Sequence, residues 1–359
     1  MKLIILVLLI EWFAPIAVFC QQLATAQEDN IPVCCQVTAA DNEFSGLTKW
    51  RSYVLLVPQH VSDTAIQQII AIDTSSIDSV LTHQSDSIYQ YTTIVFDTSL
   101  RSVIHTIQHA IGKHNKYGGF EAVVAVGDSL YFTVETDSVC YVVKGMIKGE
   151  NNKYRVVFKP KDIRELQKPN YRFANAGFEN LAYLPASKRL ISLYENNNLP
   201  SAATGYSFRT DLSKKQALHF DKPLLFRLTD ITATKDSAGS EALLGINFFY
   251  NDFKRDTGSS ATEFDYYLTG DTNKVYTSKQ LSTAFAAMHG GNLMKDCFSR
   301  IISLRLHDNS ISWKEEKVIS YKADNWEGIT LYKKGVLMII DGRPPGVTCR
   351  LSYFKLDKE

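Results

Sequence analysis

Three glutamates recur in the same local setting along this sequence. Glu121, Glu179 and Glu327 each follow an aromatic residue and come at the start of a short apolar strand pattern. A turn and a second apolar run follow each glutamate, which is the pattern of a β-hairpin. The second run of each copy ends at another acidic residue: Glu135, Glu195 and Asp341. Carboxylates spaced this regularly are candidates for a shared site.

Two weaker copies of the pattern carry a hydroxyl residue in place of the glutamate. Ser45 takes that place before the run Tyr53–Val57, and Thr229 takes it before Ala242–Ile246, with Asp230 next to it. Asp230 therefore joins the candidate acids, whereas Ser45 and Thr229 interrupt a fully acidic series.

Acids that begin equivalent strands converge on one end of an axis when those strands surround it. Like charges held close together repel each other unless a cation or shared protons neutralise them. Ca²⁺ prefers about 6–8 oxygen ligands, which carboxylates, carbonyls and water supply. The sequence therefore predicts a calcium site made by Glu121, Glu179, Asp230 and Glu327. The alternative is structural: each acid accepts backbone N–H groups at its own turn, apart from the others.

Other candidate residues give weaker signals. Arg343 lies in a rigid turn with glycines and prolines, where its planar guanidinium suits an anionic substrate; a solvated loop arginine is the alternative. His105 and His109 are one helical turn apart and His114 follows, but no third ligand at close spacing completes a metal motif. The sequence contains no nucleophile elbow, P-loop or dinucleotide fingerprint.

The spacing of the copies predicts the fold. Glu121 and Glu179 are 58 residues apart, Glu179 and Thr229 are 50 apart, and the 98 residues from Thr229 to Glu327 leave room for one unrecognised unit near residue 278. A period of about 50 residues with about four strands per unit is typical of a β-propeller. We therefore expect an all-β fold, a propeller of six blades with seven as the alternative, whose repeats run from about residue 40 to 356. Only residues 64–72 and 99–111 have a helical pattern.

The two ends of the chain indicate how the ring closes. Residues 32–38 are predicted to form a strand before the first unit, and the last unit is one strand short. The N-terminal strand would fill that place and remove an exposed sheet edge. This closure would bring Cys34 or Cys35 near Cys349, which predicts a disulfide there, with Cys297 as the competing partner. With Cys140, five cysteines remain after residue 26, so at least one has no partner within the chain.

Residues 1–26 have the features of a cleaved export signal. Lys2 precedes a long apolar segment, and Ala24–Ala26 matches the small-residue cleavage pattern. A retained membrane anchor is one alternative, although Glu11 interrupts the apolar segment with a charge. Lipid attachment at Cys20 is the minor alternative. No later segment is long and apolar enough for a membrane helix, so residues 27–359 are expected to form one exported domain, periplasmic or secreted.

The charge balance limits the class of partner. The chain has 39 Lys and Arg residues against 38 Asp and Glu, a formal net charge of +1. Nucleic-acid binding needs a basic surplus or stripe, so it is not expected. A small-molecule or anionic substrate and a monomeric protein are expected instead.

The repeated motifs resemble those of the phytase-like β-propeller family, also called the esterase-like activity of phytase family. Gly177–Phe178–Glu179 and Asn325–Trp326–Glu327–Gly328–Ile329 carry the resemblance, which extends over roughly residues 40–356. It implies a propeller fold, and related folds include calcium-dependent lactonases as well as pure binding scaffolds.

Two functions follow as hypotheses. The first is a calcium-dependent hydrolase of an ester or phosphoester, in which the ion polarises the substrate and lowers the pKa of a bound water. Glu179 would be the general base, with Arg343 on the substrate. The second is a non-catalytic propeller that binds a ligand or a protein, in which the repeated acids are structural.

Overall fold

The computed structural model describes residues 26–34, 37, 43–60, 68–112, 117–137, 139–151, 153–168, 177–195, 205–222, 224, 227–250, 297–320, 324–340 and 349–356. Residues 1–25, which include most of the predicted export signal and Cys20, lie outside these ranges. Within them the chain forms twenty β-strands and two α-helices, which confirms the all-β prediction. Neither helix is long and apolar enough to cross a membrane.

The described strands form five units, each an antiparallel sheet of four strands. Unit one consists of β2 (Phe44–Trp50), β3 (Tyr53–Pro58), β4 (Gln68–Asp73) and β5 (Thr92–Phe96). Unit two consists of β6 (Tyr117–Val126), β7 (Ser129–Thr136), β8 (Val139–Glu150) and β9 (Lys153–Gln167). Unit three consists of β10 (Ala182–Leu184), β11 (Arg189–Leu193), β12 (Gly205–Arg209) and β13 (Gln216–Phe220).

The remaining two units complete the arrangement. Unit four consists of β14 (Arg227–Lys235), β15 (Glu241–Tyr250), β16 (Cys297–His307) and β17 (Ser310–Ser320). Unit five consists of β18 (Trp326–Tyr332), β19 (Gly335–Ile340), β20 (Arg350–Lys355) and β1 (Glu28–Ile31). Parallel pairing of β5 with β9, and of β13 with β17, joins units one to two and three to four into two eight-stranded sheets.

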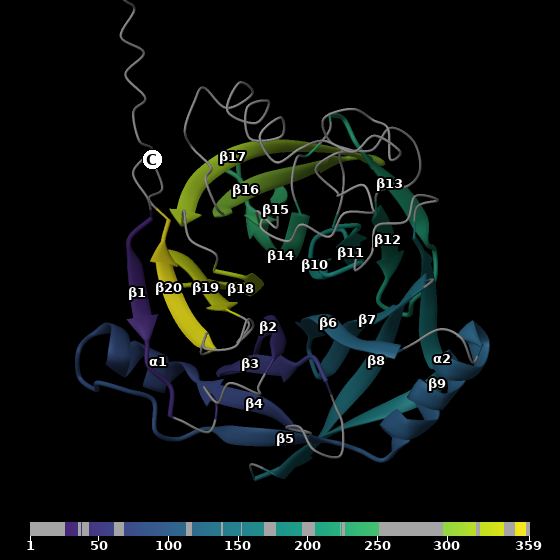
Figure 1. Cartoon of the computed structure of the whole chain (residues 1–359), viewed down its shortest axis with the longest axis horizontal. Coiled ribbons are helices and arrows are strands. Elements are labelled where there is room, and N and C mark those ends of the chain that lie inside the picture. The colour runs from purple at the N-terminus through teal and green to yellow at the C-terminus, as the bar shows by residue number, and fades with distance from the viewer. Residues whose placement is uncertain are drawn as a thin grey trace, which may run out of the picture.

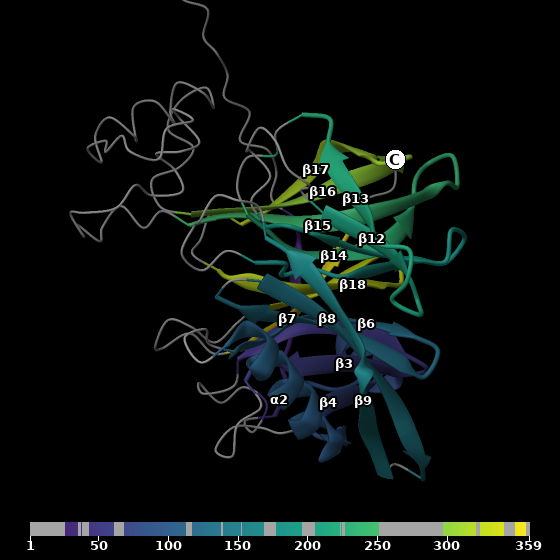
Figure 2. The same cartoon turned by 90° about the vertical axis from the view of Figure 1, so that its right-hand side faces the viewer.

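The first strands of the units surround a common axis. β2 contacts β6, β6 contacts β10, β10 contacts β14, β14 contacts β18, and β18 contacts β2. Figure 1 shows these five strands around the centre of the molecule, with the later strands of each unit towards the outside. Figure 2, the side view, has unit four at the top and unit one at the bottom. The fold is therefore propeller-like.

Five of the six predicted units lie within the described residues. The unit expected near residue 278 falls within residues 251–296, outside the described residues. β15 and β16 lie on either side of this segment and pair directly with each other. Whether this segment forms a further unit therefore stays a prediction.

The helices lie near the outer strands. α2 (Ser99–Ile111) agrees with the predicted helix and contacts β9. The helix expected over residues 64–72 is wrong, because Gln68–Asp73 is strand β4 and α1 (Thr74–Leu81) begins after it. Asp73 caps α1 by accepting a hydrogen bond from the Ser75 backbone N–H, which fixes the start of the helix.

An N-terminal strand completes unit five, four residues earlier than the sequence predicts. β1 pairs antiparallel with β20, and Ile31 lies opposite Leu351. Cys34 and Cys349 pack in the hydrophobic cluster that also contains Ile31 and Leu351. Cys34 is not part of a disulfide, so the predicted Cys34–Cys349 pairing is wrong for this structure. Cys35 and the side chain of Cys297 lie outside the described part, so pairing of Cys35 with Cys349 stays a prediction.

We expect β1 to contribute substantially to stability. Ile31 is buried, whereas Asp29 on the same strand is exposed. Ile31→Ala should lower the free energy of unfolding by about 2–5 kcal/mol, because it leaves a cavity against β20. The matched change Asp29→Ala should have an effect within about 0.5 kcal/mol. Chemical denaturation measures both, and equal effects would contradict a packed role for β1.

Candidate functional site

A β-bulge occurs at the same place in the first strand of four units. The pairing register shifts between Phe44 and Gly46, between Phe120 and Ala122, between Leu228 and Asp230, and between Trp326 and Gly328. The extra residues are therefore the repeated ones of the sequence pattern: Ser45, Glu121, Thr229 and Glu327. A bulge removes a residue from the ladder and re-aims its side chain, often beside a functional site.

Unit three reaches the same arrangement in another way. Glu179 and Asn180 precede the short strand β10. The Asn180 side chain donates to the Leu193 carbonyl at 2.9 Å and accepts from the Leu193 N–H at 2.7 Å, as a backbone partner would. We call Ser45, Glu121, Glu179, Thr229 and Glu327 the axial residues, and the three glutamates among them the axial acids.

A buried apolar residue precedes every axial residue. These anchors are 0 or 1% exposed: Phe44, Phe120, Phe178, Leu228 and Trp326. Because each anchor is fixed in the core, the backbone of the axial residue that follows it is held in place. The apolar-acid motif thus has a packing reason as well as a chemical one.

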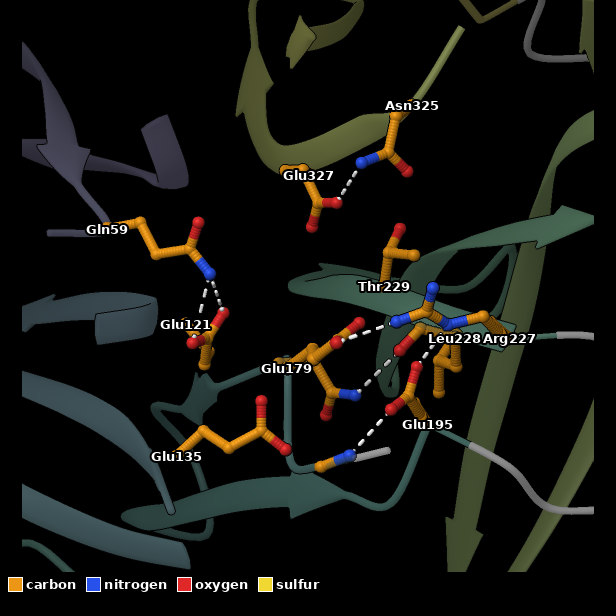
Figure 3. A network of polar contacts seen from close by, with 12 residues as sticks. Gln59, Glu121, Glu135, Glu179, Glu195, Arg227, Leu228, Thr229, Asn325 and Glu327 are labelled. Atoms are coloured by element: carbon orange, nitrogen blue, oxygen red, sulfur yellow. Dashed lines mark hydrogen bonds and ion pairs between the residues drawn. The ribbon is translucent and has the colours of Figure 1, made fainter. Parts of the chain in front are cut away.

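The axial acids share one polar network with the acids that end the second strands. Figure 3 shows Glu121, Glu179 and Glu327 with Glu135 and Glu195. The carboxyls of Glu135, Glu179 and Glu327 all act electrostatically on Glu121. The structure thus brings together the two acidic series of the sequence, except Asp341, which lies outside the described residues.

Glu121 is buried without a cation beside it among the described residues. The Gln59 amide Nε2 donates to both of its carboxylate oxygens, at 3.1 and 3.0 Å. Burial raises the pKa of Glu121 well above its ordinary value, and the nearby carboxyls of Glu135, Glu179 and Glu327 raise it further. Glu121 therefore keeps its proton to a higher pH than a surface carboxyl does.

Glu179 is also buried, but an arginine contacts it. Arg227 Nη2 lies 2.7 Å from Glu179 Oε1, and Arg227 Nε pairs with Glu195. Burial raises the pKa of Glu179 well above its ordinary value, Arg227 lowers it, and the Glu195 carboxyl raises it. Glu179 Oε2 is buried, and no described N–H or O–H group donates to it. Among the buried side-chain oxygens of the axial residues in the described part, Glu179 Oε2 is the one without a hydrogen-bond partner.

Glu195 and Glu135 each have a basic partner. The Glu195 carboxylate also accepts a hydrogen bond from the Gly177 backbone N–H at 2.5 Å. Lys168 Nζ lies 2.8 Å from Glu135 Oε1. These ion pairs reduce the repulsion among the acids, and they hold the ends of the second strands against the axis.

The Asp230 carboxylate accepts hydrogen bonds from backbone N–H groups instead of contributing to a site on the axis. Its Oδ1 accepts from the Ile231 N–H and its Oδ2 from the Ile329 N–H, both at 2.8 Å. A third backbone hydrogen bond comes from Leu181. Burial nevertheless raises the pKa of Asp230 well above its ordinary value. Asp230 thus connects units three, four and five, which is the structural alternative considered for the repeated acids.

The donors around the predicted metal ligands do not fit a calcium cage. Backbone N–H groups take both Asp230 oxygens, Arg227 pairs with Glu179, and the Asn325 amide donates to Glu327. A cation would have to displace these donors from the oxygen lone pairs. In the described part of the chain, no three Asp, Glu, His or Cys side chains converge as metal ligands do.

Other sequence candidates lie elsewhere. Arg343 and His114 fall outside the described ranges. His105 and His109 are exposed on α2 at the outside of the molecule. A separate groove of about 840 Å³ lies between β5 and the tip of the β8–β9 hairpin, lined by residues such as Val95 and Arg155, at the periphery and not at the axial acids.

Sequence reasoning missed the partners of the acids. Arg227, Lys168, Gln59 and Asn325 do not recur with the period of the units. One signal was present for Gln59, because it ends the second strand of unit one just as Glu135 and Glu195 end theirs. Its side chain contacts the axial acid of the following unit.

The similarity of this chain to known proteins is found in solved structures and not in sequence comparisons. No family model matches the chain, and no curated protein matches it. The PQQ-bound aldose sugar dehydrogenase of Streptomyces coelicolor is similar over 92% of this chain and 98% of its own, with 9% identity and a TM-score of 0.45. An oxidoreductase of Thermus thermophilus, named as a glucose dehydrogenase, is similar over 92% of this chain and 100% of its own, with 9% identity and a TM-score of 0.42.

A third similar structure is the sialidase of Trypanosoma rangeli, over 92% of this chain and 58% of its own, with 8% identity and a TM-score of 0.37. Likenesses this distant carry no inference about activity. None of the three is a phytase, and membership of the phytase-like family is not shown.

The raised pKa of Glu121 predicts a pH-dependent effect of Glu121→Gln. The protonated form stabilises the fold fully below the unfolded pKa, and this contribution is lost as pH rises through the higher folded pKa. The side-chain amide in the Glu121→Gln variant is neutral at every pH, so the variant does not lose this stability as the pH rises. The melting temperature of Glu121→Gln should therefore match the wild type near pH 4 and exceed it by about 2–5 °C at pH 8. Exposed Glu150→Gln is the control, and a gain independent of pH would contradict the assignment.

Arg227 should be far more important for stability than a surface arginine. Arg227→Gln leaves two buried carboxyls without their cation, which typically costs about 3–5 kcal/mol. The loss should be smaller at pH 5 than at pH 8, because protonated carboxyls need no counter-charge. Arg51→Gln, which breaks the exposed pair with Asp128, should cost less than about 1 kcal/mol. Urea denaturation at both pH values measures the difference, and a similar loss in both variants would show that Glu179 and Glu195 do not depend on Arg227.

Proposed function

We propose that the protein is a hydrolase of an uncharged carboxylic ester, linear or cyclic, which binds at the axial acids, and that Glu179 transfers the proton. The observation that carries the proposal is the state of Glu179. Its Oε1 is held by Arg227, while its buried Oε2 has no donor among the described residues. A fixed carboxyl with one open oxygen is suited to accept a proton from, or donate one to, a bound molecule.

The electrostatic surroundings of Glu179 favour this role. Proton transfer is most efficient when the pKa of the catalytic group lies near the working pH. Burial raises the pKa of Glu179 well above its ordinary value, and Arg227 opposes that rise. Perturbed carboxyls at the centre of a fold are candidates for such chemistry.

The charge of the site limits the substrate. A phosphoester dianion would meet Glu121, Glu135 and Glu179 close together, and the donor pattern does not fit a bridging calcium ion. An uncharged ester avoids this repulsion. Gln59, Asn325 and Arg227 place N–H groups at the same network, where they can bind the oxygens of such a substrate.

The reaction balances without an added group. Ionised Glu179 takes a proton from water as the water oxygen bonds to the ester carbon. Protonated Glu179 then returns that proton to the alkoxide as the bond between carbon and the leaving oxygen breaks. The products are one carboxylic acid and one alcohol, and Glu179 ends in its starting state. Arg227 holds the carboxyl in place throughout.

The setting of this activity is also a proposal. Export, to the periplasm or beyond the cell, rests on residues 1–26, and the single domain over residues 27–359, the monomeric state and a substrate contact by Arg343 rest on the sequence. Membership of the phytase-like family rests on the motifs around Glu179 and Glu327.

A second candidate function is non-catalytic ligand binding. It is favoured by the hydrogen bonds of Asp230 and of the hydroxyls of Ser45 and Thr229, which are used within the protein. In this case the axial acids would recognise hydroxyl or ammonium groups of a ligand without acting on it.

A substrate panel separates these functions. We expect the mature protein to hydrolyse nitrophenyl esters or lactones and not phosphomonoesters, with the same rate in calcium and in chelator. Glu179→Gln should lower the rate about 100-fold or more, as expected for loss of general acid–base catalysis, whereas Glu150→Gln should leave it unchanged. Activity on phosphomonoesters only with calcium, together with a calcium-induced rise in melting temperature that Glu179→Gln and Glu327→Gln abolish, would overturn the proposal in favour of a calcium enzyme. No turnover of any substrate would favour the binding function.

A further inference from the structure

The same kind of hydrogen bond crosses three of the junctions between units. Ser45 Oγ donates to the Phe120 carbonyl at 2.5 Å, and Thr229 Oγ1 donates to the Trp326 carbonyl at 2.7 Å. At the third junction, Asn180 Nδ2 donates to the Leu228 carbonyl at 3.0 Å. In each case the acceptor is the anchor that precedes the axial residue of the next unit.

Two of these anchors are held on their other side as well. The Phe120 N–H donates to the Gln59 carbonyl at 2.9 Å, and the Leu228 N–H donates to the Glu195 carbonyl at 2.9 Å. Both polar backbone groups of these two anchors are therefore bonded to the preceding unit. The peptide that links Phe120 to Glu121 takes its orientation from unit one, although Glu121 belongs to unit two.

The hydroxyls of Ser45 and Thr229 each have a single proton to donate. A serine or threonine side chain carries one O–H donor, and here that donor is committed to a backbone carbonyl. Ser45 is 3% exposed and Thr229 is 0% exposed. The two residues that interrupt the acidic series therefore act on the bulge that follows, and each stands one unit before an axial acid.

We propose that Ser45 and Thr229 are positioning residues: Ser45 orients Glu121, and Thr229 orients Glu327. The inference concerns the site of the proposed function, and its consequence for catalysis rests on that function.

Crossed double-mutant cycles test this proposal without a substrate. Ser45→Ala should couple to Glu121→Gln but not to Glu179→Gln, which lies two units away. Thr229→Val should couple to Glu327→Gln but not to Glu121→Gln. Coupling means that the change in melting temperature of the double variant departs from the sum of the single changes by more than about 1.5 °C, whereas distant pairs add.

Two controls and two conservative variants sharpen the design. Ser299 and Thr133 are buried, and their hydroxyls have no hydrogen-bond partner among the described residues. Ser299→Ala and Thr133→Val therefore remove the same groups without breaking a bond, and should lower the melting temperature by less than about 1 °C. Ser45→Thr and Thr229→Ser keep the donor and should restore the wild-type response of the acids. Ser45→Cys and Thr229→Cys, with a weak thiol donor, replace any alanine or valine variant that fails to fold.

The pH dependence provides the decisive readout. If Ser45 orients Glu121, the gain of Glu121→Gln at pH 8 over pH 4 should fall to about half in the Ser45→Ala background, because a loosened carboxyl can reach other surroundings. The groups that face Glu121 are Gln59, Tyr117, Glu135, Glu179 and Glu327.

A merely structural hydroxyl would lower the melting temperature equally at both pH values, and additive cycles with an unchanged pH gain would overturn the proposal. If the double-mutant cycles show coupling but the protein hydrolyses no ester, the proposed hydrolase function is refuted and the positioning role of the two hydroxyls stands.

Discussion

One extra residue in the first strand of each bulged unit determines where the acids of this protein can lie. The anchor before that residue is buried between sheets, and the ladder resumes after it, so the backbone of the bulged residue is held in place. Around the axis this local device is repeated from unit to unit. Buried carboxyls from separate sheets therefore meet in one network, which no single strand or hairpin could hold.

Gathering carboxyls in this way is costly, and the surroundings show how the cost is reduced. Arg227 and Lys168 neutralise part of the charge, Gln59 supplies amide donors, and Glu121 and Glu179 hold their protons more tightly than surface carboxyls. A protein selected only for stability would not keep such a cluster, because neutral side chains would pack there without repulsion. Strained electrostatics of this kind are typical of sites retained for function.

The sequence was a good guide to the positions that repeat and a poor one to those that do not. The aromatic-Glu motif located Glu121, Glu179 and Glu327 on one network, because the motif is itself the anchor and the residue that follows it. It could not show that Asp230 gives its oxygens to the backbone, since that depends on how neighbouring units dock. Arg227 has no counterpart in other units, so periodicity could not reveal it.

The pairing of β1 with β20 limits the order in which the units can fold. Glu28 and Ser352, which share a hydrogen bond across this pair, are 324 residues apart. Units joined by neighbouring strands can form while the chain is being made, but unit five cannot be completed until its final strand exists. Contacts between such distant residues form slowly. β1 must therefore wait for β20 to be synthesised, and until the two strands pair, β20 keeps an open edge.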